Sequence, residues 1–260
     1  MSEPAVRVER DGRVARPPGA EGAPGTPEGR GSQTRPRPAR APRPPRWLKP
    51  VVFAACLLPA AWVIWALYSD FTGVTRLLGA NPITEAEHFT GKWTLRFLIV
   101  TLSITPIRRL TGWNWLVRYR RMFGLFAFFY AALHLSMYIG VDMFFDFGDV
   151  VHDVVKHPYI TIGMAAILLL VPLAVTSTNK MVRRLGGARW RSLHRLVYVV
   201  AVLGVIHFWW AVKKDITEPL VYALIIGVLL GARIAWSERR GQVLHRASRR
   251  RWRRDARCKT

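Results

Sequence analysis

The chain has 260 residues, of which 51% are apolar, and a formal net charge of +23. In a soluble domain the charges and the apolar residues would be interleaved. Here the charge lies at the two ends and in alternate connections, while the apolar residues form runs close to the length that a bilayer core about 30 Å thick requires. Basic segments beside apolar helices follow from the positive-inside rule, so we do not expect a nucleic-acid partner. The composition predicts an all-α integral membrane protein.

The two ends differ from the rest of the chain. Residues 1–46 are rich in Pro, Arg, Gly and Ala with almost no large apolar side chain, which predicts a disordered basic tail. We expect a membrane domain over 47–237 and a second basic tail over 238–260, whose arginine run at 249–254 suits anionic lipid. The first apolar run follows its basic leader without a cleavage site, which favours a signal anchor.

Six apolar segments follow in chain order, and the second is short and contains Arg96. They are 51–68, 93–107, 122–141, 159–176, 193–212 and 220–236. The connections between them alternate in charge. Acidic residues lie in 69–92 (Asp70, Glu85, Glu87) and before the fourth segment (Asp142, Asp146, Asp149, Asp153), and basic ones lie in 108–121 and between Lys180 and Arg191. This alternation predicts that both tails face the cytoplasm.

Three histidines lie within the predicted membrane segments, where an ionisable group is costly and therefore points to function. His134 lies 134 − 121 = 13 residues past Arg121, which corresponds to a rise of about 20 Å toward the outer side. His207 lies 212 − 207 = 5 residues before the outer end of its helix. The two are therefore predicted to lie at similar depth, in the outer half of the membrane.

Two neutral imidazoles that face each other between helices can ligate a haem iron from both sides. Ala131 and Gly204 precede His134 and His207 by about one turn, which would leave space on the face that each imidazole uses. The sequence therefore predicts a b-type haem between His134 and His207. The alternative is that the histidines only form hydrogen bonds between helices or relay protons.

His194 is predicted to mark a separate inner site. It lies 207 − 194 = 13 residues from His207 on the same helix, about 20 Å lower and about 140° around the axis. A second histidine pair would need a partner low on the third helix, where Arg120 and Arg121 lie instead. The inner site could hold a haem with one protein ligand or a mixed pair, a flavin, or a quinone.

An interfacial histidine and the two cysteines are further residues whose side chains could bind a cofactor or a metal. His88, in the sequence HFTG, could contact a haem edge or a quinone at the outer interface, or it could be a solvated loop residue. Cys56 and Cys258 have no neighbouring Cys or His at ligand spacing, so we expect neither an iron–sulfur nor a zinc site.

Eight sequence motifs resemble one known family. They are HFTG (88–91), TLSITPIRR (101–109), RRMFGLF (120–126), LHLSMY (133–138), KHPYITIGM (156–164), LAVTSTNKM (173–181), WRSLHRLVYVVA (190–201) and IHFWWAVK (206–213). Together, over about 85–215, they resemble the MsrQ (formerly YedZ) family. Its members are the haem-binding membrane subunits of the bacterial protein-methionine-sulfoxide reductase system, within the ferric-reductase-like transmembrane superfamily.

This resemblance implies a six-helix domain in the bacterial inner membrane that binds haem b and often FMN. It implies electrons from the quinol pool or a cytosolic flavin reductase, passed to the periplasmic molybdopterin enzyme MsrP, which repairs oxidised methionines. His134, His194 and His207 correspond to the haem-associated histidines of the family. The larger superfamily has two histidines on each of two helices, and this chain has arginine in place of the fourth.

Two other functions fit the same residues. One is a stand-alone cytochrome b of the ferric-reductase type that reduces a small acceptor at the outer face. The other is a transporter or proton channel that uses these histidines without a cofactor. In the main hypothesis the chain carries no catalytic residue, and sulfoxide reduction takes place on the partner.

Overall fold

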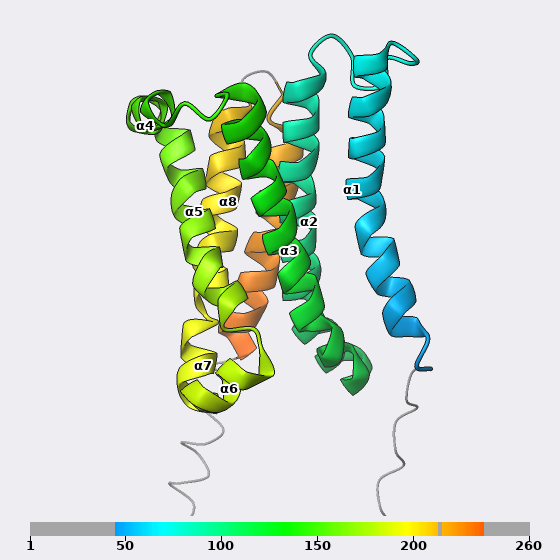
Figure 1. The fold of residues 1–260 in the computed structure, drawn as a ribbon. Helices are drawn as coiled ribbons and strands as arrows, with labels where there is room; N and C mark the ends of the chain where they lie inside the picture. Colours follow the sequence, from blue (N-terminus) through cyan, green and yellow to red (C-terminus); the bar gives the residue numbers. More distant parts are fainter. Residues whose placement is uncertain (1–44, 213–214, 237–260) are drawn as a thin grey trace, which may run out of the picture. The chain divides into compact units, whose positions relative to one another are not determined.

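The computed structural model describes residues 45–212 and 215–236, and its regular elements are all helical (Figure 1). In chain order they are α1 (Leu48–Thr72), α2 (Pro82–Thr111), η1 (Asn114–Leu116), α3 (Val117–Met137), η2 (Tyr138–Asp142), α4 (Phe147–Lys156), α5 (Pro158–Val175), α6 (Asn179–Leu185), α7 (Gly187–Leu193), α8 (Leu196–Ala211) and a helix over Thr217–Trp236.

Five helical stretches within the described residues are long and apolar enough to cross a membrane. They are Leu48–Thr72, Asn114–Asp142, Pro158–Val175, Gly187–Ala211 and Thr217–Trp236, and each contains most of one predicted segment. The remaining predicted segment, 93–107, lies in α2. This helix has 30 residues and is about 45 Å long, but its hydroxyl and charged side chains make it less apolar than the five. The protein is therefore multi-pass, and a sixth crossing by α2 stays a prediction.

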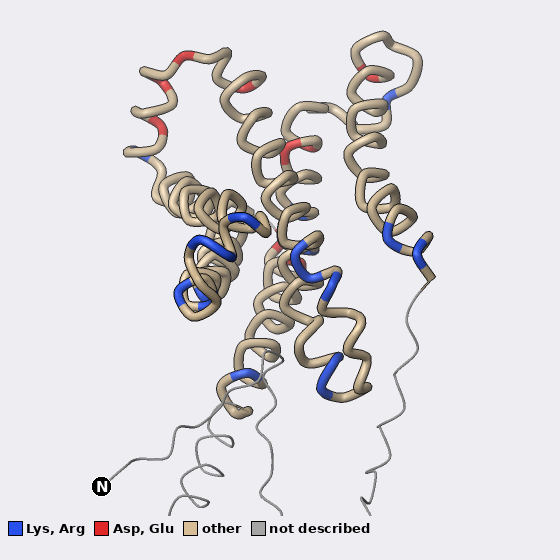
Figure 2. Tube along the Cα trace, turned by 60° about the horizontal axis from the view of Figure 1, so that its bottom comes forward, with Lys and Arg blue, Asp and Glu red and all other residues tan. Residues whose placement is uncertain are grey.

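The long helices form a bundle in which α2 packs along α3 and α5 packs along α8. Contacts of α3 with α5 and of α2 with α8 join the two pairs, and α1 packs on α2 and α3. Figure 2 shows acidic residues mainly on the connections at one end of the bundle, and basic residues mainly toward the other. We call the acidic end the outer end, following the charge rule.

Local sequence explains where α2 begins and ends. The Asn81 side chain accepts a hydrogen bond from the Thr84 backbone N–H, and Pro82 occupies the first turn, where its missing N–H costs nothing. At the other end Gly112 adopts a left-handed conformation with φ of 74° and closes the helix on the Arg108 carbonyl. These signals place the HFTG motif inside the helix rather than in a loop.

Tyr130 of α3 ties α1 to the bundle. Its fully buried hydroxyl donates to the Cys56 carbonyl at 2.8 Å and accepts from the Ala60 backbone N–H at 3.0 Å. These two groups would otherwise bond each other along α1, so the hydroxyl is inserted into the helical ladder next to Pro59. Figure 1 shows that α1 changes direction about half-way along its length.

The Thr217–Trp236 helix is held against α2 at two levels. Lys92 pairs with Glu218 at 2.6 Å, and the Arg96 guanidinium donates to the Tyr222 hydroxyl at 3.0 Å. Deeper in the bundle, Arg233 donates to the Leu102 carbonyl at 2.8 Å and to the hydroxyl of Tyr198. Two nitrogens of a charged side chain within a membrane segment thus bond inside the protein, while its buried Nε lacks a hydrogen-bond partner among the described residues.

Three short α-helices, α4, α6 and α7, were not predicted. α4 lies where the sequence suggested only an acidic connection, and α6 and α7 lie in the basic connection between the fourth and fifth segments. Asp146 starts α4 by accepting hydrogen bonds from the backbone N–H groups of Gly148 and Asp149. Apart from residues 45 and 46, the two predicted basic tails lie outside the described residues.

Candidate functional site

A cavity of about 320 Å³ lies between α2, α3, α5 and α8 in the outer half of the bundle. Its volume falls in the range of small-molecule and cofactor sites. Most of its wall is apolar, as for Leu98, Ile167 and Val200, and both His134 and His207 line it. The cavity is therefore apolar with a few convergent polar groups, the usual composition of a ligand site.

The rings of His134 and His207 come together across this cavity. Their centroids are 6.1 Å apart and their planes are at 74°. An imidazole nitrogen lies about 2 Å from a metal that it ligates, so two rings on opposite sides of one ion have centroids roughly 6 Å apart. The similar depth that the sequence predicted for the two residues thus becomes direct proximity.

Both imidazoles are held in one tautomer. Nδ1 of His134 bonds the Glu87 carbonyl at 3.0 Å, and Nδ1 of His207 bonds the Tyr159 carbonyl at 2.7 Å. Because a carbonyl oxygen only accepts, each Nδ1 must carry the proton, which leaves each Nε2 with a free lone pair. A hydrogen bond from the distal nitrogen to a carbonyl is the usual support for a metal-ligating histidine.

Two glycines allow the neighbouring helices to approach these rings. A Cβ atom on Gly163 of α5 would lie 2.7 Å from Nδ1 of His207, far inside van der Waals contact. A Cβ atom on Gly91 of α2 would meet the His134 ring at 3.4 Å, which is an ordinary contact. Gly163 is therefore required for the present position of His207. The sequence reasoning did not single out either residue, although both lie in quoted motifs.

Of the two small residues that the sequence did single out, both Ala131 and Gly204 line the cavity. The space beside Gly204 is occupied by Leu95, whose Cδ2 atom would lie 3.0 Å from a Cβ at that position. Gly204 thus serves the packing of α8 on α2 rather than giving room directly to an imidazole.

The charged groups of the cavity are unevenly distributed. Among the described residues, three carboxylates line it, those of Glu87, Asp142 and Asp153, whereas Lys92 is the one lining residue with a permanent positive charge. Burial and, second, the neighbouring Asp142 raise the pKa of Glu87 to about 7. His88 also lines the cavity, but its side chain is exposed, in agreement with a place at the mouth.

His194 lies apart from this pair. It follows the last residue of α7, and a turn at 194–195 separates it from α8, whereas the sequence predicted one helix for His194 and His207. Its Nε2 is 3.2 Å from the Thr176 hydroxyl, and its ring stacks on Trp190 with centroids 4.0 Å apart. The Trp190 indole donates to the Thr176 carbonyl at 2.9 Å. This inner cluster is packed with protein groups, and the structure brings no second histidine to it within the described residues.

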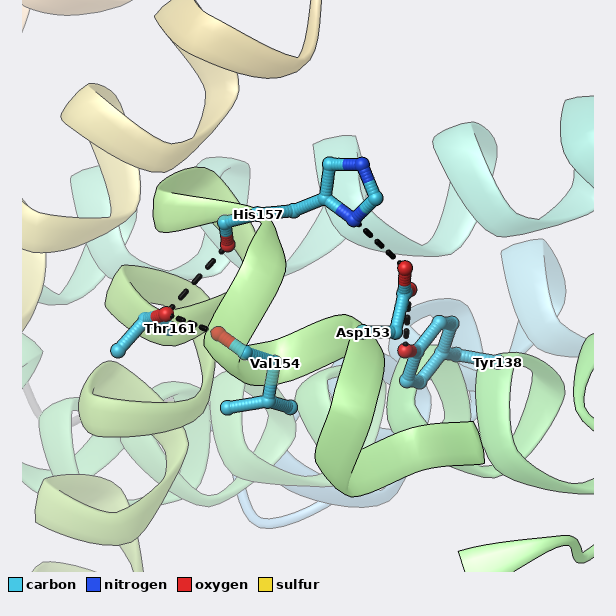
Figure 3. Close-up of polar contacts among 5 residues, drawn as sticks. All are labelled: Tyr138, Asp153, Val154, His157 and Thr161. Atoms are coloured by element: carbon cyan, nitrogen blue, oxygen red, sulfur yellow. Dashed lines mark hydrogen bonds and ion pairs between the residues drawn. The ribbon is translucent and has the colours of Figure 1, made fainter. Parts of the chain in front are cut away.

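A polar network at the outer end was missed by sequence reasoning (Figure 3). Asp153 of α4 accepts from the Tyr138 hydroxyl at 2.7 Å and pairs with Nδ1 of His157 at 2.6 Å. Thr161 donates to the Val154 carbonyl and so closes the junction between α4 and α5. The sequence carried one usable signal, the i, i+4 spacing of Asp153 and His157, but only inside a helix that it did not predict.

Comparisons with known proteins agree with this architecture. The family described as "Ferric reductase like transmembrane component" matches residues 90–205. A "Protein-methionine-sulfoxide reductase heme-binding subunit MsrQ" from Herminiimonas arsenicoxydans is 52% identical over 200 residues, covering 75% of this chain and 89% of that protein. The proteins of the same name from Rhodospirillum rubrum and Ralstonia nicotianae are 56% identical over 189 residues and 50% identical over 195 residues.

These two alignments cover 73% and 74% of this chain, and 88% of each relative. The resemblance seen in the sequence motifs is thereby confirmed over most of the membrane domain. The chain belongs to the MsrQ family of protein-methionine-sulfoxide reductase heme-binding subunits, within the ferric-reductase-like transmembrane proteins.

Proposed function

We propose that this chain is a membrane electron-transfer subunit that holds haem b between His134 and His207. The observation that carries the proposal is the geometry of the pair, with ring centroids 6.1 Å apart and both Nδ1 atoms bound to main-chain carbonyls. The names of the relatives, which describe heme-binding subunits, support the same cofactor.

The residues present fit a haem. His134 and His207 offer a nitrogen ligand from each side, and the apolar wall suits the faces of a macrocycle. Lys92, which pairs with Glu218, could turn its positive charge to the haem carboxylates, whereas the carboxylates of Glu87, Asp142 and Asp153 would repel them. When bound, the haem supplies one-electron redox chemistry.

The protein's own contribution is to bind, orient and exclude water. The two carbonyl hydrogen bonds fix which nitrogen of each imidazole faces the cavity, and the closely packed helices limit access of solvent. Because His134 and His207 would both hold the haem, it would supply electron transfer rather than substrate turnover. In this proposal the chain has no catalytic residue.

We place the chain in the bacterial inner membrane with both termini cytoplasmic, as the distribution of acidic and basic connections supports. The donor is the quinol pool or a cytosolic flavin reductase. The acceptor is the periplasmic molybdopterin reductase MsrP, which repairs oxidised periplasmic proteins. His194 marks an inner site for a further haem or FMN, where a ligand through Nε2 would have to replace its contact with Thr176.

A second candidate function is a stand-alone cytochrome b that reduces a small acceptor at the outer face. It is favoured by one observation, the match of residues 90–205 to the transmembrane component of ferric reductases. Rapid oxidation of the reduced protein by ferric chelates or oxygen, with no effect of MsrP, would select this function.

The absorption spectrum of the detergent-purified protein, oxidised and dithionite-reduced, tests the proposal when haem and flavin are counted per chain. We expect a low-spin b-type spectrum that is lost in His134→Ala and in His207→Ala. Addition of purified MsrP and a sulfoxide substrate should then reoxidise the reduced protein. A colourless protein, even after expression with haem supplied, would favour a cofactor-free transporter or proton channel instead.

A further inference from the structure

Helix α4 has two different exposed rows. Phe147, Val151 and Val155 follow one another at i, i+4 and i+8, and their side chains are 66%, 63% and 79% exposed. Asp149, His152 and Lys156 form an exposed polar row (the polar row). On an ideal helix the centres of the two rows are about 130° apart. The bundle covers neither row, because Val150 and Asp153 face the bundle between them.

The place of α4 indicates what covers the apolar row, which comprises Phe147, Val151 and Val155. The helix follows the candidate span Asn114–Asp142 and precedes the candidate span Pro158–Val175, with a few residues on either side. It must therefore lie close to the end of the membrane that these two spans share. Figure 1 shows α4 end-on at the outer end of α5, so its axis runs across the bundle helices.

A helix that lies across the bundle at this level has lipid on one side and water on the other. An amphipathic helix in the membrane interface places its apolar row among the acyl chains and its polar row in water. The neighbouring connection adds two rings, since Phe144 and Phe145 are 82% and 66% exposed. The apolar row thus continues the lipid-facing surface of the adjacent spans.

Helix α4 also forms part of the candidate haem cavity. Asp153, on its bundle-facing side, lines the cavity and binds the Tyr138 hydroxyl at 2.7 Å (Figure 3). Tyr138 lines the same cavity from the end of the preceding span. The position of α4 at the interface therefore determines the position of one outer wall of the cavity.

We propose that α4 is an interfacial helix whose Phe147, Val151 and Val155 contact the outer leaflet, and that this lipid contact keeps the outer wall of the cavity in place. The partner of the apolar row is thus the bilayer itself. The second part of the proposal rests on the proposed function, because it concerns the retention of haem, whereas the lipid contact does not.

Spin labels test the lipid contact without reference to haem. Single cysteines replace Phe147, Val151 and Val155, and in matched variants Asp149, His152 and Lys156, in a Cys258→Ser background of the full chain. Cys56 is only 6% exposed, and the background protein shows whether it takes up label. In phosphatidylethanolamine–phosphatidylglycerol vesicles we measure collision of each label with oxygen, which partitions into lipid, and with a water-soluble nickel chelate.

We expect labels on the apolar row to collide mainly with oxygen, and labels on the polar row mainly with the nickel chelate. Higher collision with nickel than with oxygen along the apolar row would overturn the proposal. Exclusion of both reagents there would also overturn it, because the row would then be covered by a second copy of the chain.

The link to the cavity is tested by haem release to apomyoglobin from the same vesicles. Val151→Asp and Val155→Asp place a carboxylate in the lipid-facing row and should speed haem release several-fold, while the matched variant His152→Asp should not. If the carboxylate moves a label on the apolar row out of the lipid but haem release stays unchanged, the effect on the cavity is refuted. The lipid contact of the unmodified row still stands. Absence of haem from the unmodified chain would instead refute the proposed function.

Discussion

Two histidines, one in α8 and one in the turn just before it, differ in how far they are prepared to bind a metal. At the outer end, His207 faces His134 across a cavity, and main-chain carbonyls occupy Nδ1 of both rings. At the inner end, Nε2 of His194 already contacts the Thr176 hydroxyl, and Trp190 covers the ring. The Nε2 atom of His207 is therefore left available for a ligand, whereas that of His194 is engaged by a protein group.

From this difference we expect the hydrogen bond on the distal nitrogen, and not burial alone, to mark the preorganised ligand. A ring whose Nδ1 is tied to the backbone presents Nε2 at no further cost in orientation. A ring whose Nε2 is hydrogen-bonded must first break that contact. Binding of a metal centre at the inner end therefore requires rearrangement, whereas binding at the outer end does not.

The largest expected effect comes from removal of the outer ligands. His134→Ala and His207→Ala each leave the iron with one protein ligand, so we expect the low-spin b-type spectrum and most of the bound haem to be lost. His194→Ala serves as the matched variant, since it removes a histidine just before α8, and it should keep that spectrum. Absorption spectra and haem per chain, measured on all three purified proteins, provide the comparison.

The reverse pattern would break the contrast between the two ends. If His194→Ala abolished the low-spin spectrum while His134→Ala preserved it, the inner cluster would be the main haem site despite its contact with Thr176. The outer pair would then have only a packing role.

A smaller but specific effect is expected at Gly163. Gly163→Ala places a methyl group where it would lie 2.7 Å from Nδ1 of His207, so the ring or its bond to the Tyr159 carbonyl must shift. We expect a lower haem content and a perturbed spectrum. Gly91→Ala, with a contact of 3.4 Å to His134, should have a weaker effect, and Gly227→Ala, with nothing within 4 Å, should have none. Equal spectra for all three would show that His207 is not held by this contact.

The sequence predicted the membrane segments better than the elements between them. Apolar runs of the required length identified the five candidate spans, because hydropathy depends on local composition alone. α2 was predicted only at its apolar centre, since the part from Pro82 to Lys92 is polar and becomes helical through its cap and its packing on α3. α4 was missed because its helical signals, the Asp146 cap and the i, i+4 spacing of Phe147 and Val151, extend over only ten residues within an acidic connection.

For the site, helix rise was enough to bring His134 and His207 to one level. What it could not provide was the azimuth of each ring and its hydrogen bonds, which depend on how the helices pack. Gly163 illustrates this limit. A glycine inside a membrane helix suggests a close approach, but only the structure shows that the approaching group is His207.

A moderate effect is expected from the positive charge of Lys92 at the outer cavity. Among the described residues Lys92 is the one permanently positive side chain that lines the cavity, and it pairs with Glu218 at 2.6 Å. If a haem carboxylate takes Lys92 from this pair, Lys92→Gln should speed release of haem by about tenfold, the effect of losing a charge-assisted hydrogen bond of about 1.4 kcal/mol. Lys92→Arg should restore retention, and Arg96→Gln, one turn further along α2, should leave release unchanged. Release rates to apomyoglobin that are identical for Lys92→Gln and the unmodified protein would remove Lys92 from the haem site.

The smallest expected effect concerns the carboxylates that line the cavity. The pKa of Glu87 is raised from 4.5 to about 7, first by burial and then by Asp142, so the folded state binds more protons than the unfolded state between these values. The contribution of Glu87 to stability is therefore fully present below about pH 4.5 and is lost as the pH rises through 7. Glu87→Gln should reduce the fall in thermal midpoint between pH 5.5 and pH 8, and should raise the midpoint at pH 8.

The exposed Glu85, two residues earlier on α2, provides the control, because Glu85→Gln should leave the pH dependence unchanged. An equal response of the two variants would mean that Glu87 is as well solvated as Glu85, and that the carboxylate side of the cavity is open to water.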